Sequence, residues 1–383
     1  MDEWPLTRLG EIVKIEHGWA FPGSGFVAPT GSLPRIVNIG DFALPYASLL
    51  KTTTMREFVG DYPARFELAP GDILIAMTCQ TRGGEVLGIP MHVPDDGRSY
   101  LHNQRLGKAV VLRPDLVDSS FLYYVFLNRR FNGHLVATAS GSAILHTAPD
   151  RIESYTFRLP PLVEQRAVAE VLGALDDKIE ANNQQVELLW SIVRSLYVSA
   201  TQNADLAPLR ELVQLAYGKG LPASKRAGGP VPVFGSGGIA GWHNQPLVIG
   251  PGVVVGRKGT IGSVYWVDAD FFPIDTTFYA VPEVGVPAIV AYLTLDAIDF
   301  SDMNSDSAVP GLNRNAALSK AVPLLSKAAM SQLAEATQPL VGLAKCLAEE
   351  SGTLQEIRDT LLPKLMSGEL RVRDAEHLVE DAV

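Results

Sequence analysis

The sequence has few cysteines, no long apolar run and no excess of positive charge. Its 383 residues include two cysteines, Cys79 and Cys346, which lie one in each half and lack the spacing of a metal-binding motif. They argue against a disulfide framework and a zinc site, and they fit a reducing compartment. No apolar run approaches the roughly 18 residues that span a membrane, and the first residues lack a signal-peptide pattern. We therefore expect a soluble, cytoplasmic protein with no membrane partner.

The net charge of −10 is unevenly distributed along the chain. Residues 1–160 hold 15 Lys and Arg against 16 Asp and Glu, and residues 207–325 hold 8 against 9. Most of the acidic excess lies in residues 161–206 and 326–383, which hold 3 against 7 and 6 against 10. Nearly neutral regions can still carry local basic faces, so the net charge neither supports nor excludes nucleic acid as a ligand.

The chain contains the same pattern twice, about two hundred residues apart. The segment LGEIVKIEHG at residues 9–18 returns as LRELVQLAYG at residues 209–218. Each copy continues to a Pro-Gly turn before an apolar run, PGDILIA from Pro70 and PGVVVGRKG from Pro251. Each then reaches a Ser-Ala pair ahead of a long helical pattern. This period exceeds the about 20–50 residues of solenoid repeats, so it indicates a duplicated globular domain.

Within each copy, short apolar runs bounded by glycine and proline predict strands and turns. One helix is expected in each copy, at residues 119–131 and near residues 286–298. Dense glycine and proline favour an irregular α+β domain with prominent loops. The strands are expected at residues 35–42, 71–77, 107–114, 253–256, 263–268 and 276–281.

Two segments show apolar residues at alternating spacings of four and three, which is the seam of a coiled coil. In the first, Asn182 occupies a seam position and should fix the register at some loss of stability. In the second, Glu350 occupies a weak position, and Pro339 predicts a kink or a late helix start. Such a seam needs a partner helix, and the alternative is an ordinary amphipathic helix packed on its own domain. The seam residues are Val168, Leu172, Leu175, Ile179, Val186, Leu189, Val193 and Leu196, then Leu333, Ala336, Leu340, Leu343, Leu347, Leu354, Ile357 and Leu361.

These patterns predict an α+β chain of two similar domains separated by two long helices that pair as an antiparallel coiled coil. About 35 helical residues at 1.5 Å rise would make a rod of about 50 Å, roughly the length of 15 base pairs. Such a rod would hold two heads at a fixed spacing, which suits a two-part target. The expected segments are residues 1–158 (first domain), 159–203 (helix), 204–325 (second domain), 326–372 (helix) and 373–383 (flexible tail).

Two helical motifs carry a resemblance to a known family. They are LPPLVEQRAVAEVLGALDDKIEANNQQVELL at residues 159–189 and LQEIRDTLLPKLMSGELRV at residues 354–372, and the stretches GDILIA, GRKGTIG and SGSAILH fit as well. Over essentially its whole length, the chain resembles the specificity (S) subunits of type I restriction-modification systems. The resemblance implies two target-recognition domains, each reading one half of a bipartite double-stranded DNA sequence. It also implies that the paired helices act as spacer and docking platform for two methyltransferase (M) subunits, joined by restriction (R) subunits.

The sequence contains no constellation typical of catalysis. FGSGG at residues 234–238 is similar to a turn that binds S-adenosylmethionine, but the turn-rich IAGWHNQP follows where a helix would be needed. The motif that orients a target amine is missing, and GVVVGRKGT has the wrong spacing for a phosphate-binding loop. Asp72 belongs to a Pro-Gly-Asp turn, and the lone His102 and His146 are interpreted as structural or phosphate-facing. We therefore expect a non-catalytic protein without catalytic residues, metal or cofactor.

Polar clusters on glycine-rich loops are the candidates for DNA contact. Arg and Lys read guanine, Asn and Gln read adenine, and Ser and Thr contact either. Arg257, Lys258 and Thr260 are expected at the position that matches residues 80–82 in the first copy. Most such contacts would reach phosphates, and fewer would reach bases. The candidates are Thr78, Gln80, Thr81, Arg82, Asn103, Gln104 and Arg105 in the first domain, and Lys219, Lys225, Arg226, Ser236, Arg257, Lys258 and Thr260 in the second.

The helices should also carry the surface for the methyltransferase subunits. The polar residues expected to be exposed there are Glu164, Gln165, Asp177, Lys178 and Arg358. A function of a different class stays open at this point, because the duplicated heads could bind protein or carbohydrate while the coiled coil sets their spacing. DNA binding, together with neighbouring genes for a methyltransferase, would discriminate between the two.

Overall fold

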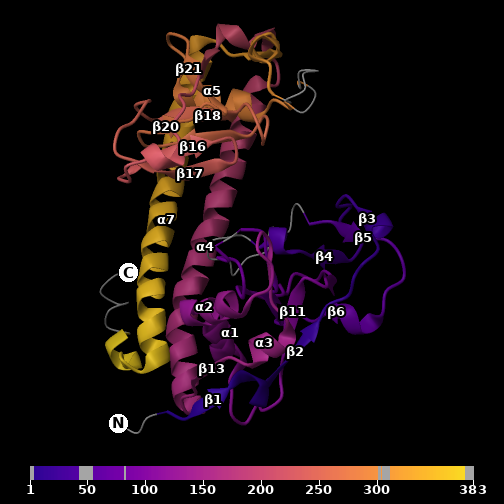
Figure 1. The fold of residues 1–383 in the computed structure, drawn as a ribbon. Helices are drawn as coiled ribbons and strands as arrows, with labels where there is room; N and C mark the ends of the chain where they lie inside the picture. The colour runs from indigo at the N-terminus through magenta and orange to yellow at the C-terminus, as the bar shows by residue number, and fades with distance from the viewer. Residues whose placement is uncertain (1–3, 43–54, 82, 301–302, 304–310, 376–383) are drawn as a thin grey trace. The chain divides into compact units, whose positions relative to one another are not determined.

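The computed structural model describes residues 4–42, 55–81, 83–300, 303 and 311–375. The chain divides into two compact units (Figure 1). The first unit comprises residues 1–182 and 350–383, and the second comprises residues 183–349. The expected flexible tail at residues 373–383 lies mostly outside the described residues, which end at Ala375.

The first unit is built on an antiparallel sheet of four strands in the order β2-β11-β7-β9. Its central strand β7 is the apolar run GDILIA, and alternate residues of this strand enter two different cores. Ile73 and Ile75 lie in one core, whereas Leu74 and Ala76 lie in the other. Burial on both faces explains why this strand is continuously apolar instead of alternating. The bounds are β2 Val13–His17, β7 Ile73–Ala76, β9 Pro90–His92 and β11 Leu106–Val111.

A second sheet of the first unit has five strands in the order β3-β5-β4-β10-β6. Strand β10 pairs parallel with β4 and antiparallel with β6. Two short ladders, β1 with β13 and β8 with β12, complete the strands of this unit. The bounds are β1 Leu6–Arg8, β3 Phe26–Val27, β4 Arg35–Val37, β5 Glu57–Phe58, β6 Glu67–Leu68, β8 Thr78–Cys79, β10 Tyr100–His102, β12 Leu145–His146 and β13 Thr156–Arg158.

The helix expected at residues 119–131 is two helices, α1 (Ser119–Leu127) and α2 (Arg129–Thr138). The single-helix prediction is wrong because Asn128 takes an extended conformation and caps α2, accepting a hydrogen bond from the amide of Arg130 at 2.9 Å. Asn128 is itself buried. Apolar periodicity continued across this cap, and it could not reveal the break. A third helix, α3 (Pro149–Glu153), packs on the start of β2.

The second unit repeats this arrangement with fewer strands. Its four-stranded sheet has the order β15-β21-β18-β19, and a three-stranded sheet has the order β17-β16-β20. A two-stranded ladder joins β14 and β22. The bounds are β14 Asp205–Pro208, β15 Val213–Tyr217, β16 Val231–Gly235, β17 Gly238–His243, β18 Gly252–Gly256, β19 Val264–Val267, β20 Phe272–Pro273, β21 Thr277–Pro282 and β22 Ala321–Leu324.

Helix α5 (Ala288–Asp296) covers β18, β19 and β21 and fills the core of the second unit. A short helix, α6 (Arg314–Leu318), begins at Asn313, whose side chain accepts hydrogen bonds from the amides of Asn315 and Ala316. Each apolar run expected to be a strand contains one, but the run at residues 35–42 is a strand only at Arg35–Val37, because Ile39–Asp41 form a 3-10 helix. The glycine-rich turn at residues 234–238 joins β16 to β17 as a hairpin, because Gly235 pairs with Gly238. It has the shape of a strand turn and not of a cofactor-binding strand-to-helix turn.

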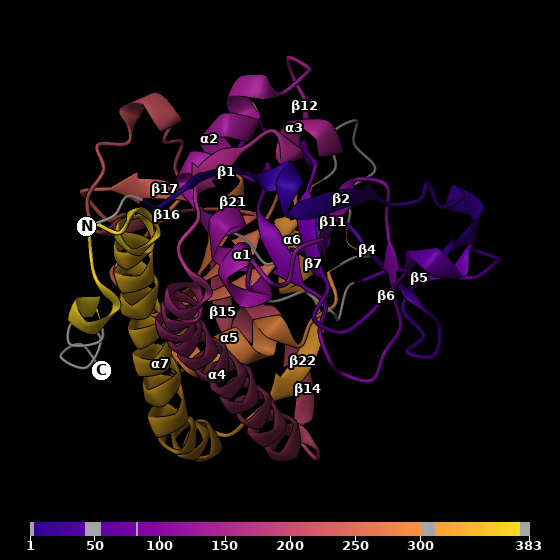
Figure 2. The ribbon, with the colours of Figure 1, turned by 90° about the horizontal axis from the view of Figure 1, so that it is seen from below.

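The two long helices are α4 (Leu162–Thr201) and α7 (Lys327–Ser367). In the first unit, Asp176 of α4 contacts Arg358 of α7, and Asn182 contacts Glu350. Because the partner number falls as the α4 number rises, the helices run antiparallel, and Figure 2 shows them side by side. The predicted antiparallel pairing is confirmed.

The polar seam residues of the two helices meet one another. Asn182 is fully buried and donates a hydrogen bond from Nδ2 to Oε2 of Glu350 at 2.8 Å, while Lys178 Nζ lies 3.3 Å from Oε1 of the same carboxylate. The polar residue in the seam of α4, Asn182, is therefore paired with the polar residue in the seam of α7, Glu350. Helix α7 begins at Lys327 and continues through Pro339, so the expectation of a late start is wrong.

Hydrogen-bond registers show that equivalent strands pair in the same way in the two units; we call this shared strand arrangement the frame. In the first unit, the amide of Met77 bonds to the carbonyl of Arg105 at 3.0 Å. In the second, the amide of Arg257 bonds to the carbonyl of Thr276 at 2.9 Å. The repeated segment ends in glycine for a steric reason, because a Cβ at Gly18 would lie 2.1 Å from a carbonyl oxygen, and one at Gly218 would do the same.

Candidate functional site

Both polar clusters predicted in the first copy line a single pocket of about 470 Å³. One wall comes from the chain after β7, and another comes from the turn between β10 and β11. The remaining wall comes from residues 38–40 after β4, with two phenylalanines. The lining residues are Phe21, Phe26, Asn38, Ile39, Gly40, Thr78, Cys79, Gln80, Thr81, Val86, Asn103, Gln104 and Arg105.

The candidates around this pocket divide into buried supports and exposed contacts. Thr78 is buried, and its hydroxyl lies 3.1 Å from Nδ1 of His146. Asn103 is also buried, and it donates from Nδ2 to Oδ1 of Asn38 at 2.6 Å. Their polar atoms hold the walls together and are not free to reach a ligand from solution. Gln80, Thr81, Gln104 and Arg105 are exposed, and Arg82 lies outside the described residues.

His102, next to the lining residue Asn103, adds no positive charge to the first pocket. Burial lowers the pKa of His102 to about 4, so its ring is neutral near pH 7 and donates from Nε2 to the carbonyl of Leu106 at 2.8 Å. His102 is therefore structural. On the rim, the hydrogen bond from the Thr81 hydroxyl lowers the pKa of the Glu85 carboxyl. An ionised Glu85 repels phosphate, so this rim suits the uncharged edges of bases better.

In the second unit, Arg257 and Lys258 follow β18 directly. The amide of Arg257 bonds to the carbonyl of Thr276 in the same way as the amide of Met77 bonds to that of Arg105. Arg257 therefore occupies the position of Met77. The next residue, Lys258, occupies the position of Thr78. The expectation that Arg257, Lys258 and Thr260 match residues 80–82 is thus wrong by several positions. The loop is shorter in the second unit, and only the ladder register reveals this difference.

The candidates of the second unit differ in exposure. Lys219, Lys225, Lys258 and Thr260 are exposed. Ser236 is buried, and its carbonyl accepts hydrogen bonds from the hydroxyls of Ser263 and Tyr265.

Arg226 is partly buried and has a structural role. Its guanidinium donates to the carbonyls of Leu221 and Ala240, and it thereby ties a turn to strand β17. Arg226 is therefore less available for a ligand than the exposed lysines.

On the helices, Glu164, Asp177 and Lys178 are exposed as expected, but Gln165 is not. Gln165 is 0% exposed, and its amide joins α4 to the first domain. Its Oε1 accepts from the amide of Asp118 at 2.8 Å, and its Nε2 donates to the carbonyls of Leu116 and Pro160 at 2.8 and 2.7 Å. A glutamine at a polar-looking position thus satisfies backbone groups that would otherwise be unpaired.

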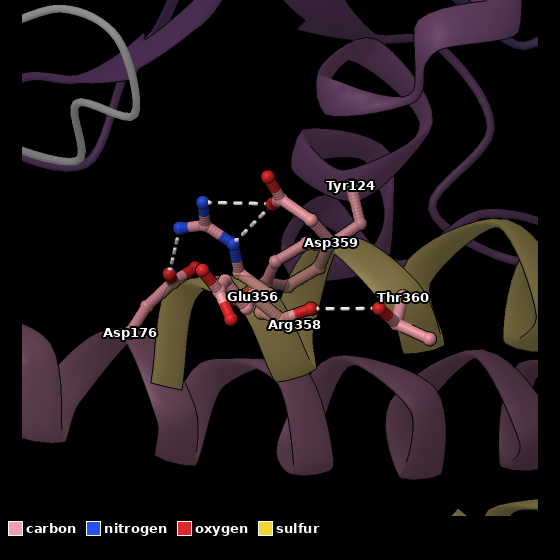
Figure 3. Close-up of polar contacts among 6 residues, drawn as sticks. All are labelled: Tyr124, Asp176, Glu356, Arg358, Asp359 and Thr360. Carbon is pink, nitrogen blue, oxygen red and sulfur yellow. Dashed lines mark hydrogen bonds and ion pairs between the residues drawn. The ribbon is translucent and has the colours of Figure 1, made fainter. Parts of the chain in front are cut away.

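Arg358 is likewise buried, at 1% exposure, so the expectation of an exposed partner contact is wrong. Its Nη1 lies 2.5 Å from Asp176 Oδ1, and its Nε and Nη2 donate to Asp359 (Figure 3). Burial lowers the pKa of Arg358, but the two carboxylates outweigh this effect and the net shift is upward. A seam arginine was read as surface charge because its partner lies far away in the sequence.

The helix ends of the first unit border a groove of about 1260 Å³. It is formed by the start of α4, the end of α7 and the segment before β1, and Glu164 is the predicted partner residue that lines it. Val163 beside it is 78% exposed.

Sequence reasoning missed Phe21, Phe26 and Asn38 as parts of the first pocket. They lie far from both predicted clusters in the sequence, and only the pairing of β4 with β10 brings Asn38 beside Asn103. Among the described residues, no cluster of three or more His, Cys, Asp or Glu side chains has the geometry of a metal site. Within the same residues, none of the helices is long and apolar enough to cross a membrane.

Comparison with known proteins bears on the resemblance found in the sequence. Residues 1–189 match the family described as type I restriction modification DNA specificity domain. The chain is 25% identical over 187 residues to the type I restriction enzyme MjaVIII specificity subunit of Methanocaldococcus jannaschii, covering 49% of this chain and 42% of that protein. It is 22% identical over 193 residues to the EcoBI specificity subunit of Escherichia coli, covering 50% and 36%. The chain thus spans less than half the length of the curated relatives it matches.

The whole chain shares a fold with a solved protein. The crystal structure of a type I restriction-modification system S subunit from M. genitalium matches with a TM-score of 0.54 over 95% of this chain and 96% of that chain, at 17% identity. At this identity the likeness shows a shared fold, while the family match concerns the DNA specificity domain of residues 1–189. The family match is carried by residues 1–189, and over the rest of the chain the likeness is one of fold.

Proposed function

We propose that this chain is a non-catalytic specificity subunit that recognises a bipartite sequence in double-stranded DNA. Each unit reads one half of the target through the loops that follow its central strands. The two long helices serve as the spacer between the recognition domains. The chain itself supplies neither cofactor nor catalytic residue, and it directs partner subunits that methylate adenine.

One observation carries the proposal. Two sequence clusters that are separated by more than twenty residues converge on one pocket of the first unit, and the equivalent edge of the second unit carries Arg257 and Lys258. A duplicated frame that displays polar side chains at the same edge suits a ligand made of two similar halves. The side chains differ between the two edges, so the two half-sites would differ in sequence.

The helices supply the proposed surface for two methyltransferase subunits, with restriction subunits joining the assembly. The exposed Glu164, Asp177 and Lys178 are the polar candidates, and the groove beside Glu164 offers apolar surface in Val163. Interfaces combine an apolar centre with a polar rim, and this groove has that composition. Gln165 and Arg358 are left out of the proposed surface because both are buried.

The experiment is co-expression of the chain with its methyltransferase subunits in a host that lacks adenine methylation, followed by sequencing of methylated adenines. We expect one new bipartite motif. Exchanging residues 1–150 for the first domain of another family member should change only one half of that motif. A change in both halves would refute the assignment of one half to each unit.

Direct binding is measured by electrophoretic mobility shift of the assembled complex on a duplex with that motif, at stated salt concentration. Equal affinity for the motif and for a scrambled duplex would contradict sequence recognition. A calorimetric titration of the isolated chain with S-adenosylmethionine should show no binding, and saturable binding would contradict the non-catalytic role.

A further inference from the structure

Two arginines of the second unit share one exposed aromatic ring. The ring belongs to Tyr217, the last residue of β15, which is 53% exposed. The guanidinium carbon of Arg257 lies 5.0 Å from its centroid, and that of Arg314 lies 5.8 Å from it. Each is within the about 6 Å at which a cation and a ring attract each other.

The three side chains are held by separate, well-connected segments. The amide of Arg257 bonds to the carbonyl of Thr276, and its own carbonyl accepts from the amide of Leu312 at 2.9 Å. Its Nη1 also donates to the carbonyl of Asp275 at 3.1 Å. Arg314 is the first residue of α6, two residues beyond Leu312. The guanidinium of Arg257 is therefore positioned before any ligand arrives, which reduces the entropy lost on binding.

The charge at this ring is not balanced within the described residues. The salt bridges of the second unit that are described join Arg194 to Asp296 and Lys345 to Glu349, so they involve neither arginine at the ring. Nε of Arg314 is buried and has no hydrogen-bond partner among the described residues. A buried donor without a partner costs free energy, and two neighbouring cations repel each other. An anion placed between them would relieve both costs.

We infer that Tyr217, Arg257 and Arg314 form a binding site for a backbone phosphodiester of DNA in the second half-site, an inference that rests on the proposed function. The planar, forked guanidinium matches the oxygens of a phosphate, and its charge is permanent. The exposed ring adds a surface for the sugar. The same edge of the first unit has Met77 in place of Arg257, so the two units bind DNA with different chemistry.

The inference predicts an uneven dependence on salt. Each phosphate that a protein neutralises contributes about 0.9 to the slope of log affinity against log salt concentration. The variant Arg257→Gln/Arg314→Gln should weaken binding of the methyltransferase-bound complex to its own bipartite duplex about tenfold. It should also reduce the salt slope by about 1, the contribution of one phosphate. Because phosphate contacts carry no sequence information, discrimination between the motif and single-base variants should stay unchanged.

The control is Lys320→Gln, which removes the charge of an exposed lysine in the same unit that does not contact Tyr217. We expect the salt slope of this variant to stay close to that of wild type, because Lys320 is not part of the proposed phosphate site. An equal slope for the double variant and the control would overturn the inference, and so would a change of base preference with the slope retained. Wild-type complex that binds scrambled and specific duplexes equally would instead count against the proposed function.

The conservative variant Arg257→Lys distinguishes ligand binding from folding. Lysine keeps the charge but loses the two parallel donors, so it should retain most of the salt slope while weakening affinity at every salt concentration. The thermal midpoint of each variant is measured alongside. If affinity fell only in variants whose thermal midpoint also fell, and the salt slope stayed that of wild type, the role of these residues would be purely structural. That result would overturn the inference.

Discussion

Arg358 of helix α7 and Asp176 of helix α4 form a buried ion pair, with Nη1 and Oδ1 2.5 Å apart although 182 positions separate them in the chain. The hydroxyl of Tyr124 on α1 donates to the second oxygen of Asp176 at 2.9 Å. Burial and the neighbouring carboxylate both raise the pKa of Tyr124, which stays protonated as a donor. One carboxylate therefore joins three helices: the two of the coiled coil and the first helix of the recognition domain.

Removing one member of this pair should be costly. Arg358→Met leaves Asp176 as a buried charge without its cation, so the free energy of unfolding of the first unit should fall by about 3–5 kcal/mol in urea. Arg113→Met is the matched control, because Arg113 and Asp115 form an ion pair of 2.7 Å with both side chains at least half exposed. Its loss should be within about 1 kcal/mol. Equal losses for the two variants would contradict the importance of burial.

The pair also has a test for coupling. The double variant Asp176→Leu/Arg358→Met removes both charges and should recover part of the stability lost by Arg358→Met alone. Tyr124 loses its acceptor in that variant, so full recovery is not expected. Additive losses would show that the two residues act independently.

Gln165 should prove essential for docking α4 on the first domain. Gln165→Ala leaves the amide of Asp118 and the carbonyls of Leu116 and Pro160 without their partner. We expect a loss of about 2–3 kcal/mol in the free energy of unfolding, since buried polar groups are then unsatisfied. The neighbouring Glu164→Ala is the control, and its exposed side chain should change stability by less than about 0.5 kcal/mol. Similar effects of the two variants would contradict the docking role.

His102 should make the first unit sensitive to acid. Its pKa is about 4 in the folded protein against 6.5 for an unperturbed histidine, so the unfolded chain binds the extra proton as pH falls between these values. The stability contributed by the neutral ring is present above pH 6.5 and is lost as pH falls toward 4. Between pH 7 and 5 the loss should be on the order of 2 kcal/mol relative to His102→Gln. If the free energy of unfolding of wild type and of His102→Gln changed equally with pH, His102 would not be the source of the acid sensitivity.

Gln104 and Arg105 should determine bases in one half-site only. Both are exposed on the rim of the first pocket, and Gln and Arg are suited to adenine and guanine respectively. Gln104→Ala or Arg105→Ala should relax the preference at one base pair by about 1–3 kcal/mol, measured by mobility shift on duplexes randomised in one half. Arg98→Ala, at an exposed arginine beside Asp96, should leave the preference intact. Relaxed preference in the other half would contradict the division between the units.

Local patterns in the sequence predicted much of the fold. The duplicated segments located the two strand frames, and the apolar runs located their strands. The seam residues predicted both long helices and their antiparallel pairing, and Asn182 was correctly assigned to the seam. The prediction failed where apolar periodicity carries no signal: Asn128 ended one helix by capping the next, and the loop after β18 was shorter than its counterpart.

The polar residues were the harder part, because sequence periodicity reports which side of an element is apolar and not which partner a polar group has. Gln165 and Arg358 look like surface residues in the chain, yet both are buried against groups that lie far away in the sequence. Thr78 and Asn103 look like ligand contacts, yet they support the walls of the pocket.

The sequence by itself determined the duplication, the helices and the family resemblance, since each is recognised from the order of residues within short segments of the chain. Tertiary structure alone decided which polar groups face solvent, how the loops after β7 and β10 form one pocket, and that Arg257 and Arg314 share the ring of Tyr217. The physical reason is that a hydrogen bond, an ion pair or a cation over a ring joins residues whose separation along the chain carries no information about their distance in space.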